Sequence, residues 1–308
     1  MKHIPVMIRE VLKYLPVEPD GITLDMTGGG GGHSAAMLER ISVKGKLIIL
    51  DRDLDAVARL KKRFEGKSNV TVVHSNFSDF DRVLDELGIL TVTSVLADFG
   101  VSLYHLKDAE RGFSFRSEGP LDMRMNQEDQ LDAAEVVNTY TRENLSNIIK
   151  KYGEENFAWN IAGAIVKARE EERIETTTQL AEIVARAVPR KAQKPGINPA
   201  TKTFQALRIH VNRELGSIED MLEKLEEYVG IGGKVAFISF HSLEDRIVKE
   251  VFKEYERECI CPPELPVCNC SKERTFRLIT RRPLEPAEDE IEMNAPSRSA
   301  KLRVAERV

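Results

Sequence analysis

The chain has 308 residues, of which 42% are hydrophobic and 31% charged, and its formal net charge is −5. This composition is typical of a soluble globular protein with one large core or two smaller ones, and it excludes a disordered chain. No apolar run approaches the length of a membrane span, and the N-terminus lacks the pattern of a signal peptide, so we expect a cytoplasmic protein without a membrane partner.

The first hundred residues alternate between strand-like and helix-like patterns. Strands are expected at 22–25, 46–51, 69–74 and 94–98, and helices at 34–41 and 54–64, the second of which Asp53 can cap. Short apolar strands that alternate with helices predict a parallel, doubly wound sheet of the α/β class.

That alternation stops near residue 104, and no good strand follows until about residue 215. A polar loop at 109–125 precedes helical patterns at 132–151, 154–171, 177–187 and 200–214, and Thr176 and Gln179 supply a helix start. The α/β pattern then resumes with helices at 217–228 and 243–255 and strands at 232–240, 275–280 and 300–305. We therefore predict a discontinuous α/β domain (1–104 and 215–308) with about seven strands and an inserted helical domain (105–214).

Five glycines, Gly28 to Gly32, follow the first strand and precede His33 and Ser34. Such a loop lets the backbone approach a ligand closely, and three ligand classes compete for it. A nucleoside triphosphate would need a phosphate-loop lysine, where this chain has His33. A dinucleotide remains open, because a run of five glycines matches almost any glycine pattern. S-adenosylmethionine needs only the close backbone approach and an acidic residue for its ribose.

The carboxyl ends of three further strands supply candidate partners for such a ligand. Asp51 ends the second strand and can bind ribose hydroxyls, although the same acid would serve NAD, cap a helix or face solvent. Phe77 follows the third strand and can cover an adenine. Asp98 ends the fourth strand, where the transferred group would lie.

Basic residues form two clusters that can make one phosphate-binding face or a solvated surface. They are Arg190, Lys191, Lys194, Lys202 and Arg208 in the first, and Lys272, Arg274, Arg277, Arg281 and Arg282 in the second.

All four cysteines lie in one short segment: Cys259, Cys261, Cys268 and Cys270. Two C-x-C pairs in a reducing compartment suggest a metal knuckle, although the spacing departs from the usual C-x-x-C pattern. A local disulfide and unmodified thiols are the alternatives.

Several longer stretches resemble one protein family from the first strand to the C-terminus. They include RGFSF and GPLDMRM within 110–125, TFQALRI at 203–209, SFHSLEDRIVK at 239–249 and PSRSAKLR at 296–303, besides GGHS at 31–34, DFGVS at 98–102 and YGEE at 152–155. The chain thus resembles the bacterial MraW (RsmH) family. Members of that family methylate N4 of a cytidine in the decoding centre of 16S rRNA, in the small ribosomal subunit.

The resemblance implies a Rossmann-like, S-adenosylmethionine-dependent methyltransferase fold and a specific cofactor site. The residues that it implies for the cofactor are Gly31, Gly32, His33, Asp51, Phe77, Asp98 and His105. Many relatives have glutamine at the position of His105, and a mixed turn where this chain has Gly28–Gly30. We expect these three glycines to be slack in the turn.

The substrate RNA would meet the loop at 109–125 and the inserted domain, because a target base must be reached outside a stack. Candidates are Arg111, Phe113, Phe115, Arg124, Lys202, Arg208 and His241. The two phenylalanines can instead anchor the loop against the sheet, and His241 can instead cap the following helix.

Methyl transfer to an amino group needs no metal, but it needs an acceptor for the departing proton. Asp98 is the best-placed candidate, with a role as cofactor ligand as the alternative, since the tetrapeptide typical of amino-methyltransferases is absent. A nucleotide-dependent dehydrogenase or NTPase, and a non-catalytic RNA-binding assembly factor, are the competing functions. The sequence leaves open the oligomeric state and whether naked rRNA or an assembled 30S particle is the substrate.

Overall fold

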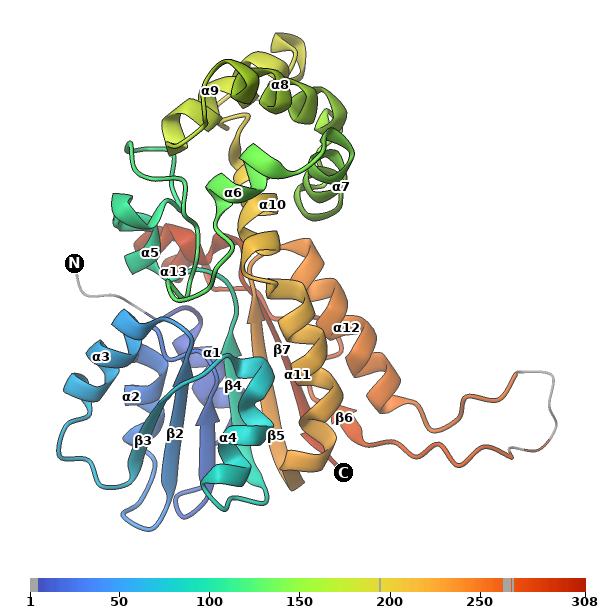
Figure 1. Ribbon diagram of the computed structural model, residues 1–308. Coiled ribbons are helices and arrows are strands. Elements are labelled where there is room, and N and C mark those ends of the chain that lie inside the picture. Colours follow the sequence, from blue (N-terminus) through green and yellow to red (C-terminus); the bar gives the residue numbers. More distant parts are fainter. Residues whose placement is uncertain (1–4, 194, 263–266, 268) are drawn as a thin grey trace. The chain divides into compact units, whose positions relative to one another are not determined.

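The computed structural model describes residues 5–193, 195–262, 267 and 269–308, so Lys194 and Cys268 lie outside the described residues. The chain forms two compact units, one of Met1–Gly100 with Leu215–Val308 and the other of Val101–Glu214 (Figure 1). A boundary after residue 104 would cut helix α5 (Leu103–Lys107), which lies wholly in the second unit. Among the described residues, none of the helices combines the length and the apolar composition that crossing a membrane requires.

The first unit contains a seven-stranded sheet with the order β3-β2-β1-β4-β5-β7-β6. The strands are β1 (Ile22–Asp25), β2 (Lys46–Asp51), β3 (Val70–His74), β4 (Val92–Asp98), β5 (Val229–Ser239), β6 (Phe276–Leu278) and β7 (Lys301–Arg307). The expected Rossmann-like α/β sheet is thus confirmed.

The strands of the first hundred residues pair in parallel, as predicted, whereas β7 runs antiparallel to both β5 and β6. A parallel neighbour would need a crossover connection, usually a helix packed on the sheet. The connection from β6 to β7 instead holds the short helix α13 (Glu288–Met293) and the 3-10 turn η4 (Ala295–Ser299). The chain therefore turns back and inserts β7 between β5 and β6.

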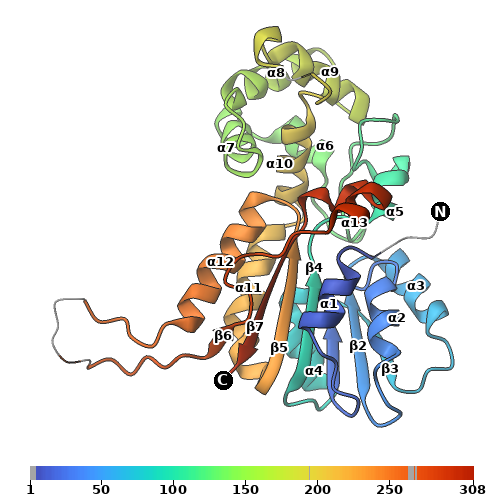
Figure 2. The ribbon, with the colours of Figure 1, turned by 180° about the vertical axis from the view of Figure 1, so that it is seen from behind.

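Helices cover both faces of this sheet, because successive side chains of a strand point to opposite faces. In β2, Ile48 and Leu50 join the core under one set of helices, whereas Leu47 and Ile49 join the core under the other. The first set is α4 (Phe80–Glu86), α11 (Glu214–Tyr228) and α12 (Ser242–Glu256), seen in Figure 1. The second set is α1 (Ile8–Tyr14), α2 (Gly32–Leu38) and α3 (Leu54–Arg63), seen from behind in Figure 2.

The second unit is helical. Its elements are α5 (Leu103–Lys107), η2 (Ala109–Arg111), α6 (Ala133–Thr139), α7 (Arg142–Gly153), α8 (Ala158–Glu171), α9 (Thr177–Ala187), η3 (Arg190–Ala192) and α10 (Thr201–Val211). They share a core of their own, with fully buried Leu145, Ile161 and Leu207 among its members. The predicted helix at 132–151 is two helices, because Thr141 caps α7 after the chain turns at Tyr140.

A buried ion pair fastens α12 to β7 in the first unit. Arg303 donates from Nε to Asp245 Oδ1 (2.7 Å) and from a terminal nitrogen to Oδ2 (3.2 Å). Burial alone would raise the pKa of Asp245, but the Arg303 hydrogen bond and charge outweigh it and hold that pKa below its usual value. Two of the stretches that carry the family resemblance therefore meet in a structural contact.

Replacing Arg303 by lysine should lower the free energy of unfolding by about 1.5–3 kcal/mol, the contribution of a hydrogen bond to a charged group, because a lysine cannot reproduce the two-pronged geometry. Urea denaturation at neutral pH measures the loss. The control is Lys301→Arg, whose parent side chain is 3.6 Å from Asp245 and 39% exposed, and which should change little. Since the pKa of Asp245 is lowered, its contribution is present above its unfolded pKa and lost as the pH falls. An equal loss in both variants would contradict the assignment.

Candidate active site

The glycine loop and three aspartates meet at one edge of the sheet. Asp25, Asp51 and Asp98 are the last residues of β1, β2 and β4. These strands are neighbours and parallel, so their carboxyl ends open toward the same side, where ligands of such sheets bind.

The glycines before Gly31 are not slack, contrary to the expectation from the sequence. A Cβ at Gly28 would lie 2.5 Å from Leu60 Cδ1 and 2.6 Å from Ile49 Cγ2, so only glycine lets the loop pass between α3 and β2. Gly29 and Gly31 have φ of 52° and 74°, which favours glycine. The loop is a tightly packed turn.

Asp51 holds this turn in place. Its Oδ2 accepts the backbone N–H of Gly29 (2.7 Å), and its Oδ1 accepts that of Asp53 (2.8 Å). The N-cap of α3 is Asp53 itself, as predicted, since its side chain accepts from Asp55 N. Asp51 is therefore not a helix cap but a brace between the loop and the end of β2, and it is half-buried at the sheet edge.

His33 is buried beneath the loop, with 7% of its surface exposed. Its Nε2 lies 2.8 Å from the carbonyl oxygen of Val6, which can only accept, so Nε2 carries the proton. The other ring nitrogen faces Asp98, with Nδ1 3.7 Å from Oδ2. A buried imidazole with one nitrogen committed to the backbone is a poor substitute for a phosphate-loop lysine.

Two further carboxyl groups, those of Asp25 and Glu244, act on Asp98. Burial first of all, and then the charges of Asp25 and Glu244, raise the pKa of Asp98 well above its usual value. Burial also raises the pKa of Asp25 to about 6, although hydrogen bonds from the Ser34 hydroxyl and the Thr27 N–H oppose the shift. The site thus contains two buried carboxyl groups whose pKa values are raised, that of Asp25 to about 6.

The carboxyl group of Asp98 is oriented but incompletely bonded. The residue's backbone N–H donates to Thr27 Oγ1 (2.7 Å), which fixes the end of β4 against the glycine turn. Its Oδ1 is buried and has no hydrogen-bond partner among the described residues. A buried acceptor without a donor is an arrangement that a bound ligand can complete.

The structure shows which residues Phe77 and His241 contact. Phe77 is half-buried in the turn after β3 and packs on Phe99, with ring centroids 5.7 Å apart. His241 caps α12: its Nδ1 accepts the N–H of Glu244 (3.5 Å), and the Glu244 carboxylate accepts the N–H groups of Phe240 and His241. The capping alternative for His241 is confirmed, whereas contact with RNA stays a prediction.

Within the second unit, the loop residues proposed for RNA make structural contacts. Arg111 is buried and donates to the carbonyl oxygens of Arg124 and Met125. Arg124 is bound through two nitrogens by Asp122. Phe113 belongs to the core of this unit and stacks on His105 with centroids 4.9 Å apart.

Phe115 meets Phe204 of α10 edge-on, with ring centroids 4.9 Å apart. The two phenylalanines therefore anchor the loop on the helical core and not on the sheet as the alternative had it. The roles of Phe113, Phe115, Arg111 and Arg124 in binding RNA, and that of His105 in binding cofactor, stay predictions.

The two basic residues of α10 differ. Arg208 is bound by both carboxylate oxygens of Glu214, at 2.9 and 3.0 Å, and its side chain is 17% exposed. Lys202 donates to the carbonyl oxygen of Glu154 but is half-exposed. Of the two, Lys202 offers the more accessible charge.

Sequence reasoning missed Asp25, Glu244 and Trp159. The position of Asp25 at the end of the first strand is a signal that could have identified it, whereas Glu244 reaches the site only through the packing of α12. Trp159 is the one tryptophan of the chain and is 47% exposed, with the Arg142 guanidinium 4.1 Å from its ring centroid. The guanidinium over the indole ring is a cation–π contact on the surface of the second unit.

The strand order with its reversed β7, the glycine turn and the acidic residues at the strand ends together define a Rossmann-like methyltransferase. The model of the MraW methylase family matches residues 1–308. The chain belongs to that family, whose methyl donor is S-adenosylmethionine, and the resemblance found in the sequence is confirmed.

Curated relatives from other organisms match this chain over its whole length. The chain is 50% identical over 307 residues to ribosomal RNA small subunit methyltransferase H of Caldicellulosiruptor bescii, covering 100% of this chain and 99% of that protein. It is 48% identical to the protein of the same name from Clostridium botulinum (strain Kyoto / Type A2), with the same coverage. The counterpart from Clostridioides difficile is 47% identical, with 99% of each chain covered. These findings favour the enzyme over both competing functions.

Proposed function

We propose that this methyltransferase acts on 16S rRNA of the small ribosomal subunit and transfers a methyl group to N4 of a cytidine in the decoding centre. The names of its relatives support the small-subunit rRNA as substrate class. The observation that carries the chemistry is the buried, unpaired Oδ1 of Asp98 beside the glycine turn. A location in the cytoplasm follows from this substrate, because ribosomal subunits are found there.

The sheet edge fits S-adenosylmethionine. This cofactor supplies a methyl group on a positively charged sulfur, and the carboxyl groups of Asp25 and Asp98 are suited to a cationic ligand. The tight turn through Gly31, Gly32 and His33 would let the backbone approach the methionine moiety. Asp51 would accept the ribose hydroxyls, and Phe77 would cover the adenine ring.

Asp98 would accept the proton that leaves the amino group. The lone pair of a cytosine amino group is delocalised into the ring, so a hydrogen-bond acceptor at N4 makes it more nucleophilic. An acceptor must be ionised, and the raised pKa of Asp98 opposes this in the protein alone. A cationic ligand nearby lowers that pKa, so the same group becomes a competent base when the cofactor is bound.

The second unit would hold the RNA. Its exposed cations include Arg190, Lys191 and Lys202, and Trp159 with Arg142 offers an exposed planar surface. Lysine and arginine bind phosphates, and an aromatic ring stacks on a base that is splayed out of a helix.

Nucleoside mass spectrometry tests the proposal. Purified protein is incubated with labelled S-adenosylmethionine and either naked 16S rRNA or 30S subunits from a strain that lacks this gene. We expect N4-methylcytidine at one site in at least one of the two substrates, and none in 23S rRNA. Label at a ring carbon or a ribose would overturn the N4 assignment, and label only in 23S rRNA would overturn the choice of subunit.

Charge reversal on the helical unit should weaken RNA binding uniformly across sequences. The double variant Arg190→Glu/Lys191→Glu should lower affinity for the RNA substrate about 10-fold or more at moderate salt. The slope of the logarithm of the binding constant against the logarithm of the salt concentration should also become less steep, by the amount that about two phosphate contacts contribute. The control is Lys44→Glu/Lys46→Glu, which places the same charges where β2 begins, at the edge of the sheet opposite the glycine loop. Filter binding across a salt series measures both. Equal losses in the two variants would show that only net charge matters.

The pH dependence of cofactor binding should follow Asp25. Its pKa is raised to about 6, so the ionised fraction grows from roughly one tenth at pH 5 to nine tenths at pH 7. If the cationic sulfonium prefers the ionised form, S-adenosylmethionine should bind up to about 10-fold more tightly at pH 7 than at pH 5. The neutral product S-adenosylhomocysteine should change less. Isothermal titration calorimetry of both ligands across this pH range measures the two affinities. In the variant Asp25→Asn, the affinity for S-adenosylmethionine should no longer depend on pH in this way. An equal pH dependence for the two ligands would contradict the role of Asp25.

A further inference from the structure

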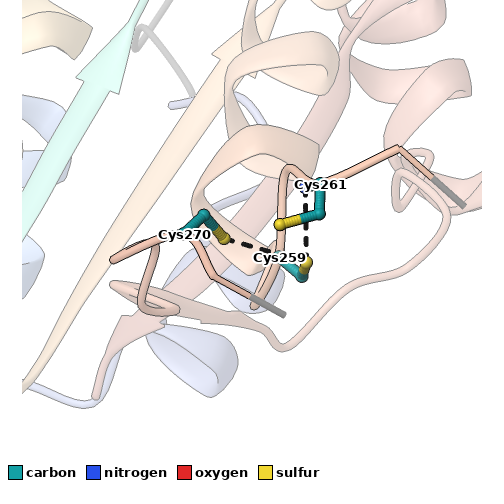
Figure 3. A group of neighbouring side chains, drawn as sticks. All are labelled: Cys259, Cys261 and Cys270. Carbon is teal, nitrogen blue, oxygen red and sulfur yellow. Dashed lines mark hydrogen bonds between the residues drawn. The ribbon is translucent and has the colours of Figure 1, made fainter. Parts of the chain in front are cut away.

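The segment between α12 and β6 contains all four cysteines of the chain, and the three described ones point toward one another (Figure 3). The sulfur atoms of Cys259, Cys261 and Cys270 all lie within 4.8 Å of one another. This cluster belongs to no part of the methyl-transfer site, so it needs an explanation of its own.

Contacts at the base of the segment bring the cysteines together. The N–H of Thr275 donates to the carbonyl oxygen of Tyr255 (3.0 Å), and Arg274 pairs with Glu258 at 3.3 Å. The two ends of the segment therefore run side by side just before Cys259 and just after Cys270. This closed base brings the start and the end of the segment together, and the sulfur atoms of Cys259 and Cys270 lie within contact distance there.

The spacing of the sulfur atoms matches metal coordination better than a disulfide. Cys259 Sγ and Cys270 Sγ are 3.8 Å apart. A disulfide requires about 2.05 Å. Two thiolates on one tetrahedral zinc ion, each about 2.3 Å from the metal, are separated by about 3.8 Å.

Backbone groups in the same turns support negatively charged sulfur. The N–H of Cys261 donates to Cys259 Sγ (3.3 Å), and the N–H of Ile260 donates to Cys270 Sγ (3.5 Å). A metal-bound cysteine is a thiolate, which such donors stabilise. The thiol of Cys261 donates to Asn269 Oδ1 at 3.4 Å, a contact that a metal would replace.

We propose that Cys259, Cys261 and Cys270 bind a thiophilic divalent cation, Zn²⁺, in a tetrahedral site. Three thiolates occupy three positions and leave one for a further ligand. Soft sulfur ligands select zinc over the hard cations Mg²⁺ and Ca²⁺, which prefer oxygen.

The strand directions indicate a structural role for this site. β6 runs parallel to β5, since both are antiparallel to β7, and α12 returns along the sheet between β5 and β6. The cysteines therefore lie at the edge where the parallel strands begin, and the glycine loop lies at the edge where they end. A metal here would fix the α12–β6 connection without touching the methyl donor.

Metal analysis of the full-length protein tests the proposal. The protein is produced with zinc in the medium, purified under reducing conditions and measured by plasma mass spectrometry. We expect about one zinc per chain in the wild type. Cys259→Ser and Cys270→Ser should each lower zinc affinity about 100-fold or more, measured by competition with a chromogenic chelator. The matched control Ser271→Ala, an exposed polar neighbour, should keep the metal.

Two further readouts separate the proposal from its alternatives. Cobalt substitution should give a thiolate-to-metal charge-transfer band that weakens in each cysteine variant but not in Ser271→Ala. S-adenosylmethionine affinity should stay within about 2-fold in all variants, which shows that the fold is intact. The proposal is overturned if the reduced wild-type chain takes up no zinc, or if the cysteine variants bind it as tightly as the wild type. Recovery of the purified, reduced protein as a Cys259–Cys270 disulfide would also overturn it.

Discussion

Asp98→Asn is expected to lower kcat for methyl transfer by about 10²- to 10⁴-fold, the usual contribution of a positioned general base. An asparagine preserves the size of the side chain and can still orient the amino group through its carbonyl oxygen, but it cannot take up the proton. Single-turnover assays with saturating cofactor isolate the chemical step from binding and product release.

The same variant should be more stable than the wild type. Burial and the charges of Asp25 and Glu244 raise the pKa of Asp98. The folded state therefore binds the proton more tightly than the unfolded state, so stability is highest at low pH and falls as the pH rises toward the folded pKa. Asparagine does not ionise, so the variant avoids this loss of stability at higher pH. Its melting temperature should exceed that of the wild type by a few degrees at pH 7 to 8 but not at pH 4.

A matched control for Asp98→Asn is Asp20→Asn, an exposed aspartate of the first unit that accepts a hydrogen bond from Ser42. It should leave both kcat and the pH dependence of stability nearly unchanged. A variant at Asp98 that loses stability and activity together would point to a structural role, and one that keeps kcat would reduce Asp98 to a cofactor ligand.

Asp51→Ala should weaken S-adenosylmethionine binding by at least about 100-fold. The substitution removes the acceptor of the Gly29 and Asp53 N–H groups, so the glycine turn loses its brace as well as the proposed ribose contact. Hydrogen bonds to a charged group contribute about 1.5–3 kcal/mol each, so the loss of two such bonds from the ribose hydroxyls corresponds to two or more decades in affinity.

Calorimetric titrations with S-adenosylmethionine and with methionine alone test whether Asp51 contacts the ribose. Loss of affinity for the whole cofactor should exceed any loss for methionine, which has no ribose. Glu65→Ala, an exposed acid shortly after α3, should bind as the wild type does. Wild-type affinity in Asp51→Ala would remove this residue from the cofactor site.

Much of the first unit could be predicted from the sequence because its strands are short, apolar and strongly bounded. Strand β2 and helix α9 appear at the expected residues, and the capping box of Thr176 with Gln179 forms as expected. Helices α1, α4 and α13 were missed, since each has only six or seven residues and shows too little periodicity. The direction of β7 depends on the connection that leads to it, which local patterns do not encode.

The acidic residues of the candidate site could be predicted from the sequence only where their position at the end of a strand identified them. Asp51 and Asp98 follow apolar strands, and this position alone marked them. The cluster that changes the pKa of Asp98 joins β1, β4 and α12, elements far apart in the sequence, so only tertiary packing brings it together. Likewise, the partners of Arg111 and Arg124 give these side chains structural contacts that a count of basic residues cannot anticipate.

The division of the sheet between the two ends of the chain has a consequence for biosynthesis. One edge of β4 pairs with β1 and the other with β5. Because β5 begins 131 residues after β4 ends (229 − 98), the second edge stays unpaired until β5 has been synthesised. At a synthesis rate of about 5–20 residues per second, this open edge persists for roughly 7–26 s on the ribosome. The helical unit is complete within that interval and can fold first. Asp98 meets Glu244 only when α12 follows, so the acidic cluster of the site is assembled late, after most of the sheet that buries it.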